Sequence, residues 1–274
     1  MRVISVASPK GGVGKTTSVL NIAAAWAVEG RRVLIVDLDW LSHTSTTLEA
    51  QAEAGGGVEG VLRGQVPLLS AICETGIENL WLLPSSPQIA TLATDALEPD
   101  RLAIDVRTIP DGYFDIVLID CPGGDARLTR QALRASDDVV LPSLPSVSGL
   151  VGALFGLELT AQVQAEQGDR PELIGILPVG ARQGELPRRF VAELAQSGIP
   201  CLSPIRHSFL LDTITAAAEV RKRILVLARP ESATAQSYRR VAAEIASGVR
   251  AVGACDQADT LMEPAPMEAV DVFA

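Results

Sequence analysis

Residues Ser8 to Thr17 read S-P-K-G-G-V-G-K-T-T, and this stretch decides the fold that we expect for the chain. The apolar, β-branched run Arg2–Ala7 before it predicts a buried strand. Thr16–Glu29 after it carries apolar residues at helical spacing. A glycine-rich loop between a strand and a helix is typical of a phosphate-binding P-loop, because glycines let backbone N–H groups turn toward a phosphate.

The side chains of the loop support this interpretation. Lys15 would contact the β- and γ-phosphates of a nucleotide, and the Thr16 hydroxyl would ligate Mg²⁺. The common pattern G-x-x-x-x-G-K-[ST] is not fully met, because Pro9 stands at its first glycine and Lys10 adds a second lysine. The alternative without a binding role is a glycine-rich turn with two solvated lysines, and the flanking strand and helix disfavour it.

K-G-G-V-G-K-T-T resembles the deviant Walker A motif, and the chain is identified as a member of the ParA/MinD family of ATPases, most similar to its short ParA-type members. The resemblance implies ATP and Mg²⁺ as cofactors. It also implies that Lys10 crosses a dimer interface to reach the phosphates bound by a partner subunit. The expected nucleotide-binding residues of the loop are Lys10, Gly11, Gly12, Val13, Gly14, Lys15, Thr16 and Thr17.

Two further predicted strands end in carboxylates. Arg32 to Asp37 leads into Asp37-Leu38-Asp39, and Phe114 to Asp120 has the Walker B pattern of apolar residues followed by an aspartate. The resemblance implies that Asp39 positions or activates the attacking water and that Asp37 supports the Mg²⁺ region. The expected metal site is Thr16, Asp37 and Asp120, and the expected catalytic residues are Lys10, Lys15 and Asp39. An aspartate after a strand can instead cap a helix.

The resemblance implies two switch loops near the γ-phosphate, one after each of these two strands, and both depart from the family pattern. Trp40, Leu41 and Ser42 replace Pro-Gln-Gly in the first loop, Asp39 to Thr46, so its detailed geometry need not follow the family. The second loop reads Cys121-Pro122-Gly123-Gly124, and its two glycines predict a mobile turn. Arg127 beyond it could be a switch or interface residue, although a solvated arginine is the favoured interpretation.

Composition limits the remaining possibilities. With 274 residues, 47% of them hydrophobic, the chain can form one α/β domain with a large core and at most a tail. Its net charge of −10 means that nucleic acid could be bound only through a local basic patch, and that acidic membranes would repel it. Four widely spaced cysteines favour reduced, cytosolic thiols over a zinc site or disulfides. No apolar run is long enough to span a bilayer, so we expect a cytoplasmic protein.

The alternation of strand and helix predicts an α/β fold: a doubly wound, mainly parallel sheet with helices on both faces. Later strands are expected at 80–84, 138–141 and 173–179, with a short one at 201–205. We expect an ATPase domain at 1–250 and an acidic, disordered tail at 251–274. The resemblance implies that the loops after the late strands flank the base of the nucleotide. The residues expected to contact the base are therefore Pro178, Arg182, Pro204 and Arg206.

Arg221-Lys222-Arg223 is the densest basic run in the chain. The family resemblance implies that such residues bind DNA phosphates without reading sequence, whereas an ordinary solvated helix face is the alternative.

The resemblance therefore implies a ParA-type ATPase that dimerises on binding ATP and Mg²⁺ and binds nucleoid DNA without sequence preference. A ParB-like or cargo adaptor protein would stimulate its slow hydrolysis of ATP, which would segregate or position a plasmid, a chromosome or another cargo. One alternative is a MinD-like membrane switch, which would need a basic amphipathic C-terminus where this chain is acidic and contains proline. Another is an iron–sulfur ATPase, which needs cysteines that bridge a cluster, and only Cys121 lies near the site. The last is a nucleotide-dependent binding module that no longer hydrolyses ATP.

Overall fold

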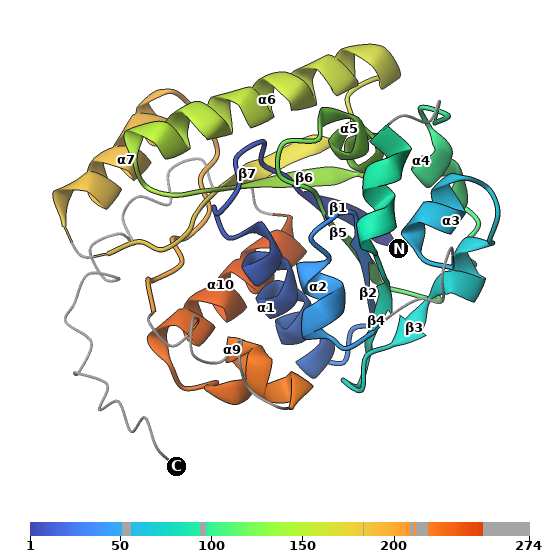
Figure 1. Ribbon diagram of the computed structural model, residues 1–274. Coiled ribbons are helices and arrows are strands. Elements are labelled where there is room, and N and C mark those ends of the chain that lie inside the picture. Colours follow the sequence, from blue (N-terminus) through green and yellow to red (C-terminus); the bar gives the residue numbers. More distant parts are fainter. Residues whose placement is uncertain (51–55, 94–96, 183, 209–210, 212–218, 249–274) are drawn as a thin grey trace.

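A central sheet organises the chain in the computed structural model, which describes residues 1–50, 56–93, 97–182, 184–208, 211 and 219–248 (Figure 1). In the described residues the sheet has seven strands in the order β3-β4-β2-β5-β1-β6-β7, all parallel to their neighbours except β3, which pairs antiparallel with β4. The strands are β1 (Arg2–Val6), β2 (Val33–Asp37), β3 (Cys73–Glu74), β4 (Leu80–Leu83), β5 (Ile116–Asp120), β6 (Asp138–Ser143) and β7 (Glu172–Pro178).

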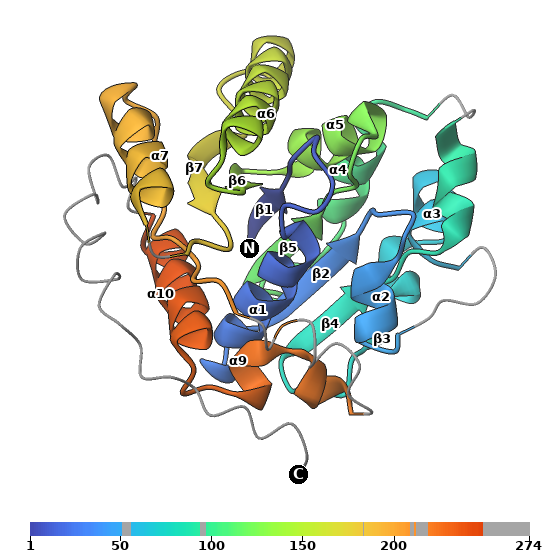
Figure 2. The same ribbon diagram turned by 60° about the vertical axis from the view of Figure 1, so that its left-hand side comes forward.

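Helices cover both faces of this sheet, which confirms the predicted fold class (Figure 2). Their bounds are α1 (Lys15–Val28), α2 (His43–Thr47), α3 (Val58–Leu62), α4 (Arg101–Val106), α5 (Ala126–Ala135), α6 (Val147–Gln167), α7 (Glu185–Gln196), α9 (Leu225–Ala228) and α10 (Ala233–Ser247). Short 3₁₀ helices are η1 (Leu68–Ala71), η2 (Pro87–Ala93) and η3 (Val220–Arg223). Residues of α1, α9 and α10 share one buried core with the sheet, and residues of α3 to α7 share the other.

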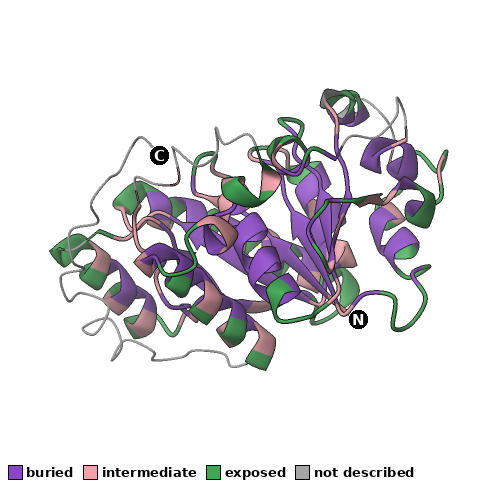
Figure 3. Ribbon diagram, turned by 90° about the horizontal axis from the view of Figure 1, so that it is seen from below, coloured by how far each residue is buried: buried purple, intermediate pink, exposed green. Residues whose placement is uncertain are grey.

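The central strands are almost fully buried because both of their faces are covered by helices (Figure 3). All five residues of β2 and of β5 are buried, and these runs are correspondingly apolar up to their terminal aspartates. On one face, Trp26 of α1 is fully buried and donates through Nε1 to the Ala242 carbonyl of α10 at 3.0 Å. The buried core is therefore organised around the two faces of the sheet.

One predicted strand is wrong. Residues 201–205 form no strand; Cys201 makes only an isolated bridge to Ile176. Pro204 within this run has no N–H to donate, so a continuous ladder cannot form there. The antiparallel β3 was not predicted, because two residues are too short for an alternating pattern to be recognised.

The register of the parallel strands places the predicted acidic residues side by side. Asp37 at the end of β2 pairs with Asp120 at the end of β5, and Val6 at the end of β1 lies on the other side of Asp120. The P-loop leaves β1 at this same carboxyl edge, which is where open α/β sheets bind ligands.

The expected tail, 251–274, lies outside the described residues. Among the residues that are described, we find no helix that combines the length and apolar character needed to cross a membrane.

Candidate nucleotide-binding site

The P-loop connects β1 to α1 through two glycines in the left-handed region. Gly12 has φ 72° and Gly14, which precedes the first turn of α1, has φ 86°. Gly14 also lies tightly against the loop after β7, because a Cβ there would come within 2.8 Å of Val179 Cγ1. Glycine is therefore required at this position both by backbone conformation and by space.

The two lysines of the loop have different surroundings. Lys15 is only 6% exposed, and its Nζ donates to the Lys10 carbonyl at 3.1 Å, inside the curve of the loop. The Lys10 side chain turns away from it and donates to Ser148 Oγ at 2.8 Å, near the start of α6. Gly152 leaves room for this, since a Cβ there would meet Lys10 Cβ at 3.4 Å. Figure 1 shows the loop after β1 below α6.

Asp120 is the centre of the acidic edge and is completely buried. Thr16 Oγ1 and Thr44 Oγ1 each donate to its Oδ2 at 2.8 Å. Within the described part of the chain, its Oδ1 has no hydrogen-bond partner. Burial, with the nearby charge of Asp37 as a second cause, raises the pKa of Asp120 to about 7. A buried carboxylate oxygen left open beside a threonine hydroxyl fits a Mg²⁺ ion, which prefers oxygen ligands.

Asp37 is also fully buried, but its oxygens are already bound. Oδ1 accepts from the Asp39 N–H at 3.0 Å, and Oδ2 accepts from Ser45 through N–H at 3.0 Å and Oγ at 2.7 Å. Burial raises the pKa of Asp37 to about 6, against these hydrogen bonds, which lower it. Its arrangement suits support of the metal region better than direct ligation.

Asp39 begins the first switch loop. Its Oδ1 accepts from the Leu41 N–H at 3.0 Å, and its carbonyl accepts from Ser85 Oγ at 3.1 Å. Trp40 and Leu41, which replace the family residues, are 48% and 46% exposed. Ser42 follows with φ 51°, an unusual conformation for a residue other than glycine. The loop is thus anchored at Asp39 and presents two large apolar side chains outward.

The second switch turn lies directly against the P-loop. A Cβ on Gly123 would lie 3.4 Å from Gly11 Cα and 3.5 Å from Lys15 Nζ. Cys121 at its start is buried, and burial raises the pKa of its thiol. Asp125 caps α5 by accepting from the backbone of Arg127 and Leu128, and Arg127 lies 3.9 Å from the Asp125 carboxylate.

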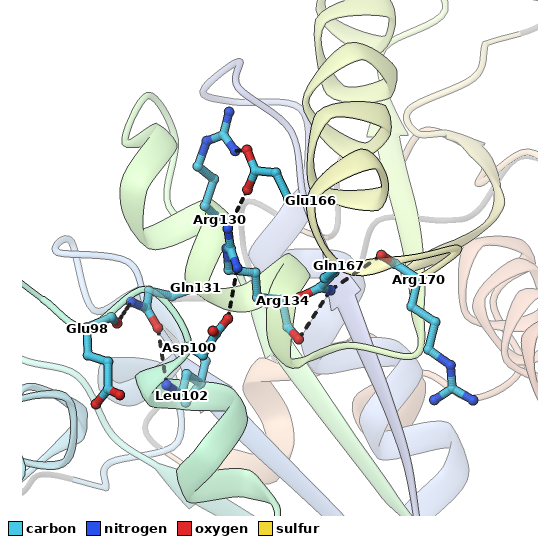
Figure 4. A network of polar contacts seen from close by, with 9 residues as sticks. All are labelled: Glu98, Asp100, Leu102, Arg130, Gln131, Arg134, Glu166, Gln167 and Arg170. Carbon is cyan, nitrogen blue, oxygen red and sulfur yellow. Dashed lines mark hydrogen bonds and ion pairs between the residues drawn. The ribbon is translucent and has the colours of Figure 1, made fainter.

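Helix α5, beyond this turn, is fastened to its neighbours by the polar network of Figure 4. Arg130 binds Glu166 of α6 at 3.0 Å, and Arg134 binds both Glu166 and Asp100, the latter at 2.9 Å. Gln131 accepts from the Leu102 N–H of α4 at 3.1 Å. The turn before α5 therefore adjoins a helix that is held on two sides.

The two loops that we expected to flank a base come together. Ile205 N–H donates to the Pro178 carbonyl at 2.8 Å, and Ala181 N–H donates to the Ile205 carbonyl at 2.9 Å. Arg182 lies 3.1 Å from His207 through Nη2 and Nε2. Since Val179 also contacts Gly14, the loop carrying Pro178 and Arg182 adjoins the P-loop.

The basic run is divided by its surroundings. Arg221 and Lys222 are exposed, and Lys222 pairs with Glu219 at 2.9 Å. Arg223 has only 16% of its side chain exposed and binds Glu49 at 2.6 Å, together with carbonyls at the end of α2. Arg223 is thus already engaged within the fold.

The structure reveals partners that the motifs did not indicate, namely Thr44, Ser45 and Ser148. The hydroxyl-rich run H-T-S-T-T at 43–47 was the available signal for the first two.

Comparison with known proteins agrees with this geometry. A family model described as an AAA domain matches residues 1–170. The chromosome-partitioning ATPase Soj of Thermus thermophilus is 37% identical over 177 residues, which are 65% of this chain and 68% of that protein.

Solved structures agree as well. Cobyrinic acid a,c-diamide synthase from Mycobacterium smegmatis, bound to an ATP analogue and magnesium, superposes with TM-score 0.75 and 29% identity over 91% of this chain and 98% of its own. The cell division ATPase MinD of Pyrococcus furiosus gives TM-score 0.74 and 25% identity over 90% and 99% of the two chains.

Proposed function

Because this chain belongs to the ParA/MinD family of P-loop ATPases, we propose that it is a ParA-type positioning ATPase. It binds ATP with Mg²⁺, dimerises in that state and binds DNA without sequence preference. A ParB-like or cargo adaptor protein stimulates its slow hydrolysis of ATP, in the cytoplasm and on the nucleoid. The observation that carries the proposal is the open Oδ1 of buried Asp120, beside Thr16 at the mouth of the P-loop.

In this proposal, each residue of the site has a separate role in phosphoryl transfer. A bound Mg²⁺ would neutralise charge on the phosphates, held by Thr16 and Asp120. Lys15, now bonded to a loop carbonyl, would transfer its hydrogen bond to a phosphate oxygen. Asp39 would orient the attacking water, while Asp37 keeps the first switch loop in register through its three hydrogen bonds.

Two features support dimerisation across the face that carries the site. Lys10 lies at the rim of the loop, bonded to an exposed serine rather than to its own phosphate pocket. Helix α6, which starts beside it, exposes a stripe of large apolar side chains at helical spacing: Val147, Val151, Leu154 and Phe155. Such a stripe is unusual on a monomer surface and is typical of an interaction site.

DNA contact is assigned to Arg221 and Lys222, which are exposed on η3. Because the protein as a whole is acidic, binding would depend on these local charges and would weaken steeply with salt.

A nucleotide-dependent binding module without hydrolysis is the second candidate. It is favoured by one observation: the exposed Trp40 and Leu41 give the first switch loop a surface that the family pattern does not have. In that case the protein would bind ATP and change its partner affinity, but release would come from nucleotide exchange.

The test is DNA binding by the purified protein with ATP, ADP or no nucleotide across a series of salt concentrations. We expect binding that requires ATP and does not depend on DNA sequence. The slope of the logarithm of the binding constant against the logarithm of the salt concentration should fall in magnitude by about 2 in the double variant Arg221→Ala, Lys222→Ala. If the protein dimerises with ATP but binds no DNA with ATP, with ADP or without nucleotide, the proposed DNA-binding function is disproved. The search would then turn to a protein or membrane surface as the partner.

A further inference from the structure

Arg223 connects the basic segment to the first switch loop. Its Nη1 donates to the Thr47 carbonyl at 3.3 Å and to the Thr46 carbonyl at 3.5 Å, and its Nη2 donates to Glu49 Oε1 at 2.6 Å. These carbonyls end α2, where backbone acceptors have no partner within the helix. The Thr46 carbonyl also accepts from the Glu49 N–H at 3.3 Å, and the guanidinium adds a donor to both carbonyls and matches the negative pole of the helix.

Helix α2 is only five residues long and carries two side chains of the site. Thr44 donates to Asp120 Oδ2 at 2.8 Å, and Ser45 donates twice to Asp37. A helix this short has little stability of its own, so its position depends on contacts from outside. The contact from Arg223 therefore helps to hold both hydroxyls on the carboxylates.

A second connection leads from the same segment to the P-loop helix. Val226 N–H of α9 donates to Asn21 Oδ1 at 3.0 Å, and Asn21 Nδ2 donates to the Thr17 carbonyl at 2.9 Å in the first turn of α1. Residues 220–228 thus contact both the switch helix and the helix that begins at the P-loop.

We propose that Arg223 is a positioning residue that sets α2 for Mg²⁺–nucleotide binding, and that residues 220–228 couple the nucleotide site to ligand bound at Arg221 and Lys222. Arg223 is then not a phosphate contact like its two exposed neighbours. The coupling to DNA rests on the proposed function, whereas the positioning of α2 does not. Since coupling is reciprocal, DNA held by the two exposed residues changes nucleotide affinity as much as nucleotide changes DNA affinity.

The first experiment needs no DNA. Affinity for a non-hydrolysable ATP analogue is measured by tryptophan emission with Mg²⁺ and with EDTA, using Trp40→Phe to identify the reporting residue. Arg223→Ala should reduce the gain in affinity from Mg²⁺ about tenfold and leave the affinity in EDTA unchanged. A general folding defect would weaken both. Arg223→Lys, which keeps a single donor group, should recover part of the loss.

The matched control is Arg229→Ala, which removes an exposed arginine just beyond α9. It should leave the Mg²⁺ gain within twofold of wild type. Glu49→Gln, which weakens the anchor of Arg223, should shift the gain in the same direction as Arg223→Ala but less. Equal Mg²⁺ gains in Arg223→Ala and wild type would overturn the positioning role.

The second experiment adds random-sequence duplex DNA. In wild type, DNA should shift the affinity for the Mg²⁺–analogue complex; in Arg223→Ala, DNA should still bind but no longer shift it. If DNA shifts the affinity for the Mg²⁺–analogue complex as much in Arg223→Ala as in wild type, the coupling role of residues 220–228 is refuted. Absence of DNA binding in wild type would instead refute the proposed function, and the first experiment would still decide whether Arg223 positions α2.

Discussion

The carboxyl edge of the sheet and the basic segment 220–223 both gather charged residues, but they hold them in opposite ways. Lys15, Asp37 and Asp120 are 0–6% exposed, and each makes hydrogen bonds of 2.7–3.1 Å within the fold. Arg221 and Lys222 are exposed, where an ion pair is worth about 0–1 kcal/mol. Among the described residues, Asp120 Oδ1 has no hydrogen-bond partner, and a buried carboxylate oxygen without a partner is costly, which points to a ligand there.

Arg223 shows that sequence neighbours need not share a role. It lies next to two exposed basic residues yet has 16% of its side chain exposed and binds α2. A run of like charges in the sequence therefore forms one charged surface only where the fold leaves all of its residues exposed.

The largest effect is expected from Lys15→Met, which keeps the stem of the side chain and removes its charge. ATP hydrolysis should fall about 10³-fold, because a preorganised cation beside the phosphates is lost. Arg107→Met, which removes an exposed charge directly after α4, should change the rate less than twofold. Steady-state phosphate release measures both. Similar losses in the two variants would remove the distinction between buried and exposed charge.

Next is Asp39→Ala, which we expect to lower the hydrolysis rate about 10²-fold while ATP affinity stays within threefold. The rate should fall because the proposed orientation of the attacking water is lost. The affinity should hold because Asp39 belongs to the first switch loop, where its Oδ1 accepts from the Leu41 N–H. Single-turnover hydrolysis and equilibrium binding separate the two quantities. An unchanged rate would favour the binding module over the ATPase.

Much of the sheet edge was predictable because strand and loop signals are local. The three strands that build the site, β1, β2 and β5, were placed within two residues of their observed ends. The pairing of Asp37 with Asp120 follows once those strands are parallel neighbours.

What could not be predicted depends on tertiary contacts. Thr44 binds Asp120, 76 positions away, and Arg223 binds Glu49, 174 positions away, so no local pattern indicates either. The predicted strand at 201–205 was wrong for a related reason: its apolar residues looked extended, but Pro204 could not complete a ladder. The base contacts and the DNA contacts remain predictions.

A smaller effect is expected from Gly14→Ala, which tests how tightly the loop is built. The left-handed φ of 86° and the 2.8 Å approach to Val179 should together lower the free energy of unfolding by about 2 kcal/mol. Gly11→Ala is the matched control, since a Cβ there meets nothing within 4 Å. Thermal unfolding of the nucleotide-free proteins compares them, and equal melting temperatures would show that Val179 yields without cost.

The smallest effect concerns pH, and it follows from the raised pKa values of Asp37, about 6, and Asp120, about 7. The folded protein binds these protons more tightly than the unfolded chain, so without metal its free energy of unfolding should fall as pH rises through this range. We expect a loss on the order of 1–2 kcal/mol between pH 6 and 8, or a few degrees in Tm. Mg²⁺ with nucleotide must displace the proton on Asp120, so its stabilising effect should be larger at pH 8 than at pH 6. Asp120→Asn should flatten the pH dependence of the free energy of unfolding measured without metal. An equally flat pH dependence in wild type would mean that the pKa values of the buried carboxyls are not raised.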